Sequence, residues 1–271
     1  MILLQHLLKT VLIMLTLLVC MSCNQKPDNI FPGYIEGEYN YIGSNIAGTL
    51  FHLNVQRGQT VKQNDLLFVL DPEPDRALMD SAKANIEDLQ SQVAFAKVQL
   101  KRYTDLYASH ATDKSTLDQK QTDYDTKTKQ LNEAQDSFIS AEWSYHQKTV
   151  YAPVSGYVFD TYFRVGEKVA ANQPVLSLLA PKNIKVLFYI PEQQLSTIHL
   201  NQVITFRCDG CKSKTKATIS YISPEAEYTP PIIYSQDTRY KLVYLVRAEL
   251  PDNMAFKFHP GQPLDIYLNE P

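Results

Sequence analysis

Two long heptad repeats between Asp71 and Val150 constrain the fold of this chain more than any other feature. Apolar or small residues recur in each repeat at spacings typical of a coiled-coil seam. In the first repeat they are Met79, Ala82, Ile86, Leu89, Val93, Ala96, Leu100, Tyr103 and Tyr107. In the second they are Leu117, Tyr124, Leu131, Ala134, Phe138, Ala141 and Tyr145. The pattern predicts two helices of about 36 residues each, packed along their seams.

A short polar link at Ser109–Ser115 separates the two repeats. Because a link this short joins antiparallel neighbours, we expect one coiled-coil hairpin. Its arms would be roughly 50 Å long at 1.5 Å per residue. Arms of that length cannot fold back onto a chain of 271 residues, so the hairpin is expected to project.

The segments that flank the hairpin are related by an internal repeat, in which every matched pair has the same offset along the chain. The matched pairs are Gly48 and Gly156, Gly58 and Gly166, Val61 and Val169, Leu67 and Val175, Phe68 and Leu176, and Leu70 and Leu178. Each half consists of a few short strands and is too small to be stable alone. The repeat therefore predicts an α+β fold in which two halves form one small β-sandwich around the inserted hairpin.

The rest of the chain, from Asn183 on, carries several short strand patterns separated by turn signals. They are Ile184–Ile190, Gln202–Phe206, Ala217–Ile222, Lys241–Ala248 and Pro263–Leu268. A short helix is expected near Glu192–Ile198 and a proline-rich loop at Pro224–Pro231. This spacing predicts a small antiparallel β-barrel over residues 183–271.

The N-terminus reads as a targeting segment. Lys9 precedes an apolar run from Val11 to Val19, which has the length of a signal-peptide core. Ser22, a small residue directly before Cys23, resembles a bacterial lipoprotein cleavage site. The resemblance implies that residues 1–23 are a lipoprotein-type signal peptide with lipid attached at Cys23. Simple secretion and an uncleaved anchor are the alternatives, and all three place the mature chain outside the cytoplasm. Residues 24–40 are predicted to be a tether.

Cys208 and Cys211 enclose Asp209-Gly210, which is a signal for a two-residue hairpin turn. In an oxidising compartment a disulfide across this turn is one prediction. Free thiols, and a metal or redox site, are the alternatives. A redox site is disfavoured because it needs its cysteines at a helix N-terminus, where the thiol pKa falls.

Nothing in the sequence predicts catalysis. The six histidines show no metal-ligand spacing, and there is no Gly-rich phosphate loop or nucleophile elbow. A net charge of −3 with 20% charged residues does not suggest nucleic acid as a partner. We therefore predict a protein that is not an enzyme and that has no catalytic residues, no cofactor and no metal.

The order of these segments over about residues 40–271 resembles the HlyD-type membrane-fusion proteins, also called periplasmic adaptor subunits. The resemblance is carried by Gly48–Asp71, Ala152–Val158, Val165–Val169, Ile190–Leu195, Ile222–Pro230 and Pro260–Ile266. It implies a split lipoyl-like (biotinyl-lipoyl) sandwich with halves at 41–71 and 151–182, a hairpin at 72–150 and a following barrel. The stretch Ile222–Pro230 looks most like adaptors that serve ABC-type exporters.

The resemblance implies a function in efflux or secretion. Such an adaptor links an inner-membrane ABC-type transporter to a TolC-like outer-membrane channel, forms a homo-oligomer (a hexamer), and is lipid-anchored in the periplasm at the inner membrane. Many members add a membrane-proximal domain after the barrel, which we do not expect here because the chain stops at Pro271. The alternative is a periplasmic lipoprotein that binds an envelope ligand without a transporter.

The family's channel-docking motif lies at the hairpin tip and consists of an arginine, a leucine four residues later and a serine seven further. Arg102 and Leu106 match this motif, whereas Asp113 stands at the serine position. Asp113 can cap the second helix as a serine would. Without the resemblance, Arg102 reads as a solvated helix residue and Leu106 as a neighbour of the seam.

Overall fold

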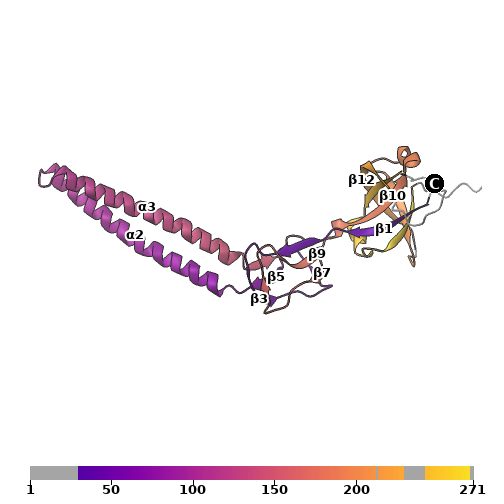
Figure 1. The fold of residues 1–271 in the computed structure, drawn as a ribbon, viewed down its shortest axis with the longest axis horizontal. Helices are drawn as coiled ribbons and strands as arrows, with labels where there is room; N and C mark the ends of the chain where they lie inside the picture. Colours follow the sequence, from indigo (N-terminus) through magenta and orange to yellow (C-terminus); the bar gives the residue numbers. More distant parts are fainter. Residues whose placement is uncertain (1–29, 212, 229–241, 269–271) are drawn as a thin grey trace, which may run out of the picture. The chain divides into compact units, whose positions relative to one another are not determined.

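The computed structural model describes residues 30–211, 213–228 and 242–268 (Figure 1). The chain divides into two compact units. One unit is Glu38–Asn183, and the other contains strand β1 (Ile30–Gly37) and the chain from Ile184 on. The predicted signal peptide and Cys23 lie outside the described residues. No helix within those ranges is both long and apolar enough to cross a bilayer.

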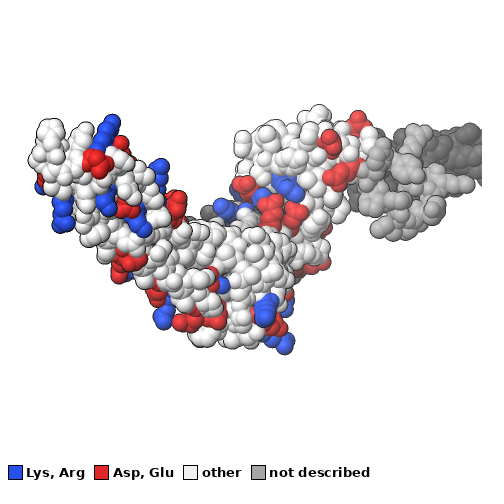
Figure 2. All heavy atoms as spheres, turned by 60° about the vertical axis from the view of Figure 1, so that its left-hand side comes forward, with Lys and Arg blue, Asp and Glu red and all other residues white. Residues whose placement is uncertain are grey.

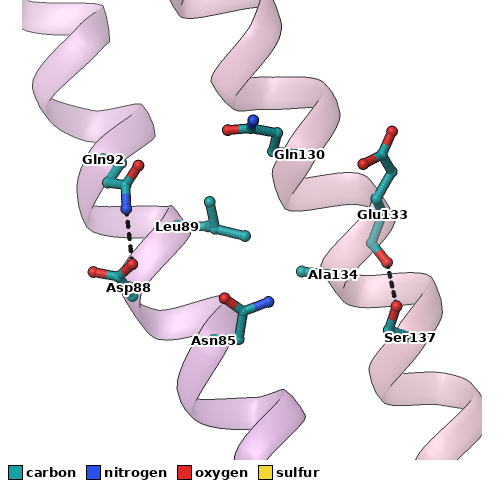
Figure 3. A pocket seen from close by; sticks show the side chains of 8 residues that line it. All are labelled: Asn85, Asp88, Leu89, Gln92, Gln130, Glu133, Ala134 and Ser137. Atoms are coloured by element: carbon teal, nitrogen blue, oxygen red, sulfur yellow. Dashed lines mark hydrogen bonds between the residues drawn. The ribbon is translucent and has the colours of Figure 1, made fainter.

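The predicted coiled-coil hairpin is confirmed. Helix α2 (Glu73–Ala108) and helix α3 (Lys114–His146) run antiparallel, and among the described elements each packs extensively on the other alone (Figure 1). Leu89 and Ala134, one heptad residue from each helix, point toward one another in Figure 3. Only Ala96 and Ala134 are fully buried on the two helices, because a two-helix coil shields one stripe of each helix.

The hairpin leaves a β-sandwich of eight short strands. They are β2 (Asn40–Gly43), β3 (Gly48–Leu53), β4 (Thr60–Val61), β5 (Leu66–Leu70), β6 (Thr149–Tyr151), β7 (Gly156–Thr161), β8 (Lys168–Val169) and β9 (Pro174–Leu179). One sheet has the order β2-β9-β7-β4 and the other β6-β5-β3-β8. Each half of the repeat therefore contributes strands to both sheets: β4 pairs with β7, and β8 pairs with β3.

The internal repeat accounts for the core of this sandwich. The pairs Val61 and Val169, Leu67 and Val175, Phe68 and Leu176, and Leu70 and Leu178 are all buried. Leu50 and Val158, which the same offset relates, are buried with them. Gly58 and Gly166 take φ angles of 83° and 92°, which other residues rarely adopt. The same turn is thus built twice.

The second unit is a closed, six-stranded antiparallel barrel with the order β1-β10-β13-β12-β11-β14. Its further strands are β10 (Ile184–Pro191), β11 (Val203–Cys208), β12 (Thr215–Tyr228), β13 (Leu242–Glu249) and β14 (Pro263–Tyr267). Short 3₁₀ turns, η1 (Pro181–Asn183) and η2 (Glu192–Thr197), precede and follow β10, and helix α4 (Asp252–Ala255) lies between β13 and β14.

The tether predicted for residues 24–40 is wrong for residues 30–37, which form the strand that closes the barrel. Strand β1 pairs with β10 on one side and with β14 on the other. Phe31 and Ile35 are buried at 6% and 0% exposure, so they supply the apolar positions of a strand. Pro32 and Gly33 hide this alternation in the sequence. The barrel therefore needs a strand from before the sandwich as well as those after it.

Two predicted turns in the barrel also differ from the structure. Asp209-Gly210 makes a tight turn, with the Cys211 N–H donating to the Cys208 carbonyl at 3.0 Å, but it is not a two-residue hairpin. Phe206 pairs with Thr215, so the connection is longer. The predicted loop at Pro224–Pro231 is wrong up to Tyr228, because β12 continues through an irregular register after Ile222. The rest of that loop lies outside the described residues.

Candidate docking site at the hairpin tip

Arg102 and Leu106 lie one helical turn apart on the outer surface of α2, close to the tip. Both line an open, shallow groove. The other lining residues are Val98, Lys101, Asp105 and Ser109. Val98 is 57% exposed and Leu106 is 36% exposed, so the groove presents apolar surface flanked by charge. Neither Arg102 nor Leu106 packs into the seam with α3, so both side chains are available for contact with another molecule.

The backbone of the tip is held by hydrogen bonds that end α2 in a Schellman motif. The Ala111 N–H donates to the Leu106 carbonyl at 2.9 Å, and the His110 N–H donates to the Tyr107 carbonyl at 3.0 Å. His110 takes a φ of 58°. The Ser109 hydroxyl also donates to the Leu106 carbonyl, at 3.0 Å. The backbone of Leu106 is therefore held by the turn itself, which fixes the point on the helix from which its exposed side chain starts.

Asp113 caps α3, as its sequence position allows. Its Oδ1 accepts from the Thr116 N–H at 2.8 Å, and its Oδ2 accepts from the Thr116 hydroxyl at 2.9 Å. These hydrogen bonds from the Thr116 backbone and side chain lower the pKa of Asp113 below its ordinary value of 3.8. Asp113 is not among the residues that line the groove. The structure thus brings Arg102 and Leu106 together and assigns Asp113 to the helix start.

We expect Asp113→Ala to fray the first turn of α3, whereas Asp113→Ser and Asp113→Asn keep a capping oxygen. Because the pKa of Asp113 is lowered in the fold, its carboxylate stabilises the cap fully above the unfolded pKa. That stabilisation is lost as the pH falls through the lowered folded value. Hydrogen exchange of the peptide that contains Thr116 measures the effect. Asp113→Asn should show no such pH dependence, and faster exchange in Asp113→Ser than in Asp113→Ala would contradict the capping role.

Sequence reasoning missed Val98 and Ser109 as parts of the groove. Val98 lies one turn before Arg102, and Ser109 lies one turn after Leu106 on the same face. The spacing of three and four residues was available in the sequence. It was obscured because the inner seam has the same period and dominates the pattern.

Cys208 and Cys211 form a disulfide in the barrel unit, with Cα atoms 5.2 Å apart. Cys208 is 3% exposed and ends β11 beside the tight turn. Within the described parts of the chain, no three His, Cys, Asp or Glu side chains gather in a way that could hold a metal ion. Figure 2 shows Lys and Arg interspersed with Asp and Glu over the visible surface, which is mostly uncharged.

Comparisons with known proteins agree with this architecture. Residues 39–180, more than half of the chain, match the family described as "RND MFP, barrel-sandwich hybrid domain". A UPF0194 membrane protein of an Enterobacter species is 25% identical over an alignment of 278 positions, which covers 83% of this chain and 84% of the relative. Another, described as the UPF0194 membrane protein in the asrC 5′ region of Acidithiobacillus ferridurans, is 30% identical over 120 residues.

Coverage differs between these relatives. The match to the Acidithiobacillus protein covers 44% of this chain and 35% of that relative. Among solved structures, the membrane fusion protein Spr0693 from Streptococcus pneumoniae R6 has a TM-score of 0.67 at 15% identity, with 89% of this chain and 100% of that chain covered. At this identity the likeness concerns the fold. The family match and the hairpin inserted between two halves of a sandwich lead to one conclusion: this chain belongs to the membrane-fusion protein family of periplasmic adaptors.

Proposed function

We propose that this chain is the adaptor of a tripartite efflux or secretion system, and that it links an inner-membrane ABC-type transporter to a TolC-like outer-membrane channel. The observation that carries the proposal is the hairpin with its exposed groove. Its longer arm has 36 residues, or roughly 50 Å at 1.5 Å per residue. Beyond their base, the helices are covered by no other described part of the chain. A long rigid arm with an apolar tip suits a bridge between two membranes.

Docking at the tip follows from the chemistry of the groove. Leu106 supplies an apolar contact, and Arg102 can donate to backbone carbonyls or carboxylates of a channel. Asp113 is engaged in capping α3 and does not line the groove. Arg102 and Leu106 are thus proposed as the contacts to the channel, with Asp113 as the residue that shapes the tip.

The remaining assignments complete the proposal. The two-sheet module is a split lipoyl-like domain, and sandwiches and barrels of several copies pack side by side into a ring, as a hexamer. The hairpins then surround a duct through which cargo passes, and the adaptor seals and couples the system without catalysis. Lipid attachment at Cys23 anchors the chain in the periplasm at the inner membrane, where each buried methylene contributes about 0.8 kcal/mol.

The class of transporter rests on the stretch Ile222–Pro230, whose described part lies in β12. Its resemblance to adaptors of ABC-type exporters favours that partner. The family description names RND adaptors, which makes an RND-type transporter the second candidate. The two differ in subunits, because an ABC-type transporter brings an ATPase and a permease.

Crosslinking in intact cells tests the proposal. The full-length, tagged protein is crosslinked, purified and analysed by mass spectrometry. We expect an ABC permease with its ATPase, together with an outer-membrane channel. Recovery of an RND pump would correct the class of transporter and leave the adaptor role in place. Recovery of neither transporter would overturn the adaptor role and favour a lipoprotein that binds an envelope ligand alone.

A further inference from the structure

Lys148 carries a charge that is buried in the fold. It lies between the end of α3 and the start of β6 and is 5% exposed. Among the residues that the structure describes, the other buried polar side chains are the hydroxyls of Ser44, Ser177 and Thr205. A buried ammonium costs desolvation free energy, so its position needs an explanation that apolar packing does not supply.

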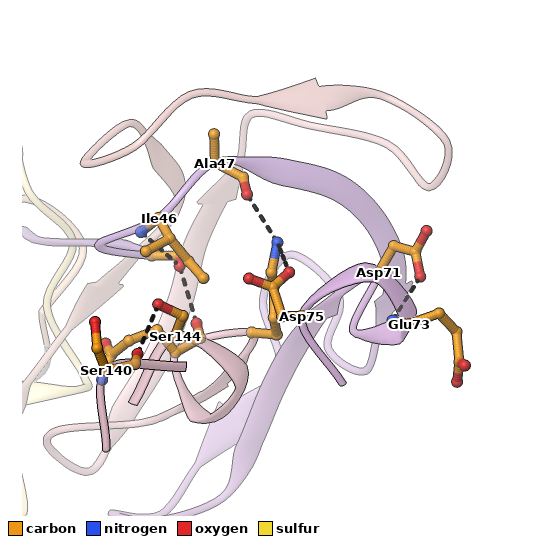
Figure 4. A network of polar contacts seen from close by, with 10 residues as sticks. Ile46, Ala47, Asp71, Glu73, Asp75, Ser140 and Ser144 are labelled. Atoms are coloured by element: carbon orange, nitrogen blue, oxygen red, sulfur yellow. Dashed lines mark hydrogen bonds and ion pairs between the residues drawn. The ribbon is translucent and has the colours of Figure 1, made fainter. Parts of the chain in front are cut away.

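The Lys148 ammonium joins three segments at the base of the hairpin. Its Nζ lies 2.9 Å from Asp75 Oδ2, in the first turn of α2, and donates to the Ala47 carbonyl at 2.9 Å. Figure 4 shows Ala47 and Asp75 converging on this nitrogen. A Cβ at Gly48 would lie 3.1 Å from Nζ, so a larger residue there would crowd the ammonium. One side chain thus connects the base of both helices to the β2–β3 connection.

The end of α3 is tied to the same connection by neutral hydrogen bonds. The Ser44 hydroxyl donates to the Gln147 carbonyl at 2.9 Å, and the Asn45 side-chain amide donates to Gln147 Oε1 at 2.8 Å. These contacts hold α3 alone. Asp75 is the residue through which Lys148 also contacts α2, so the ion pair joins the bases of both arms.

The internal repeat contains a second version of this junction without the charges. The offset that relates the two flanks also relates Lys148 to Asn40 and Asp75 to Asn183. In the structure the Asn183 side-chain amide donates to Asn40 Oδ1 at 2.7 Å and to the Glu38 carbonyl at 2.8 Å. The first turn of α2 corresponds to η1 (Pro181–Asn183), which leads out of the sandwich toward β10. The chain thus leaves the sandwich at two equivalent places, which we call the η1 exit and the hairpin exit. A hydrogen-bonded amide pair lies at the η1 exit, and an ion pair lies at the hairpin exit.

Comparison of the two exits indicates what the charges add. At the η1 exit, a neutral pair of amide side chains is sufficient to join the equivalent segments. Replacing a buried ion pair by apolar residues is often neutral for stability, whereas such a pair can restrict a structure to one geometry. We propose that Lys148 and Asp75 are positioning residues that fix the direction in which the hairpin leaves the sandwich. The relevance of that direction to docking rests on the adaptor function proposed above.

The test measures the distance between the hairpin tip and the sandwich by electron spin resonance. Nitroxides are attached through ketone-bearing amino acids at the exposed positions Ala111 and Lys168, which leaves Cys208 and Cys211 untouched. We expect one narrow distance in the full-length protein. Lys148→Met/Asp75→Leu replaces the ion pair by apolar side chains of similar size, and it should lose that narrow distance while the thermal unfolding midpoint changes little. The single variant Lys148→Met should also lose the narrow distance, with a lower midpoint, because it leaves the Asp75 carboxylate unpaired.

Two matched controls should keep the narrow distance. Asn183→Leu breaks the equivalent pair at the other exit, and Arg76→Met breaks the exposed Arg76–Glu73 ion pair one residue beyond Asp75. A narrow distance in the double variant would overturn the proposal, and so would general unfolding of the double variant, since the pair would then be required for stability. The measurement uses purified protein, so it does not depend on a transporter. If the double variant lost export but kept the narrow distance, the positioning role would be rejected and the adaptor role would remain.

Discussion

Removal of one heptad from each arm of the hairpin, residues 86–92 and 131–137, is expected to abolish export and leave the protein folded. Leu89 and Ala134 face each other at the centre of these segments (Figure 3), so the two deleted segments lie opposite each other along the hairpin. Seven residues correspond to one full repeat of the seam, which keeps its phase. The arms become about 10 Å shorter at 1.5 Å per residue, which should withdraw the tip from its proposed contact with the channel.

Export is measured with a compound to which a strain without the gene becomes sensitive, and folding is measured by circular dichroism. The control replaces the same two segments with copies of the adjoining heptads, residues 93–99 and 124–130. This variant changes the same positions but preserves length, and it should export normally. Full export by the shortened, normally expressed protein would reject the bridging role of the hairpin.

Substitution of Leu106 by Asp, or of Arg102 by Glu, should reduce capture of the outer-membrane channel by about tenfold or more, as expected for a central interface residue. Both side chains line the exposed groove and neither is fully buried. We therefore expect the hairpin to keep its helical content and thermal stability. Crosslinking yield to the channel, normalised to the transporter recovered in the same sample, is the measurement.

Leu78→Asp is the matched control for these tip variants. Leu78 lies on the same helix near the base and is 64% exposed, so it is comparable in chemistry and differs in position. It should leave channel capture unchanged. If Leu78→Asp and Leu106→Asp reduce capture equally, added charge on the helix would be the cause, and the proposal that the tip contacts the channel would be rejected.

The hairpin and the sandwich could be predicted because their sequences repeat. The alternating spacing of three and four between Met79 and Tyr107 leaves few alternatives to a coiled-coil helix. The constant offset between the two flanks located the paired core positions, such as Leu70 and Leu178, both of which are fully buried. In each case one local rule acts many times, so single exceptions do not hide it.

Features that depend on partners far along the chain could not be predicted from the sequence. Strand β1 is stabilised by β10 and β14, which lie far along the chain, and its own pattern is interrupted by Pro32 and Gly33. Likewise, Asp75 reads as a favourable charge at a helix N-terminus, and nothing local reveals that Lys148 is its partner. The docking residues Arg102 and Leu106 came from a family resemblance, since their own pattern is that of ordinary exposed helix residues.

The exchange of strands between the two sheets has a consequence for the order in which the chain folds. Gly48 pairs with Val169, and Val61 pairs with Gly156, so one sheet is complete only when the chain reaches Val169 and the other only when it reaches Leu179. Contacts between such distant residues are slow to form, because a long loop must close first. The two helices depend on local contacts and can form earlier. We expect helix pairing that starts at the tip to bring the second half of the sandwich back to the first and so to reduce the loop that the strands must close.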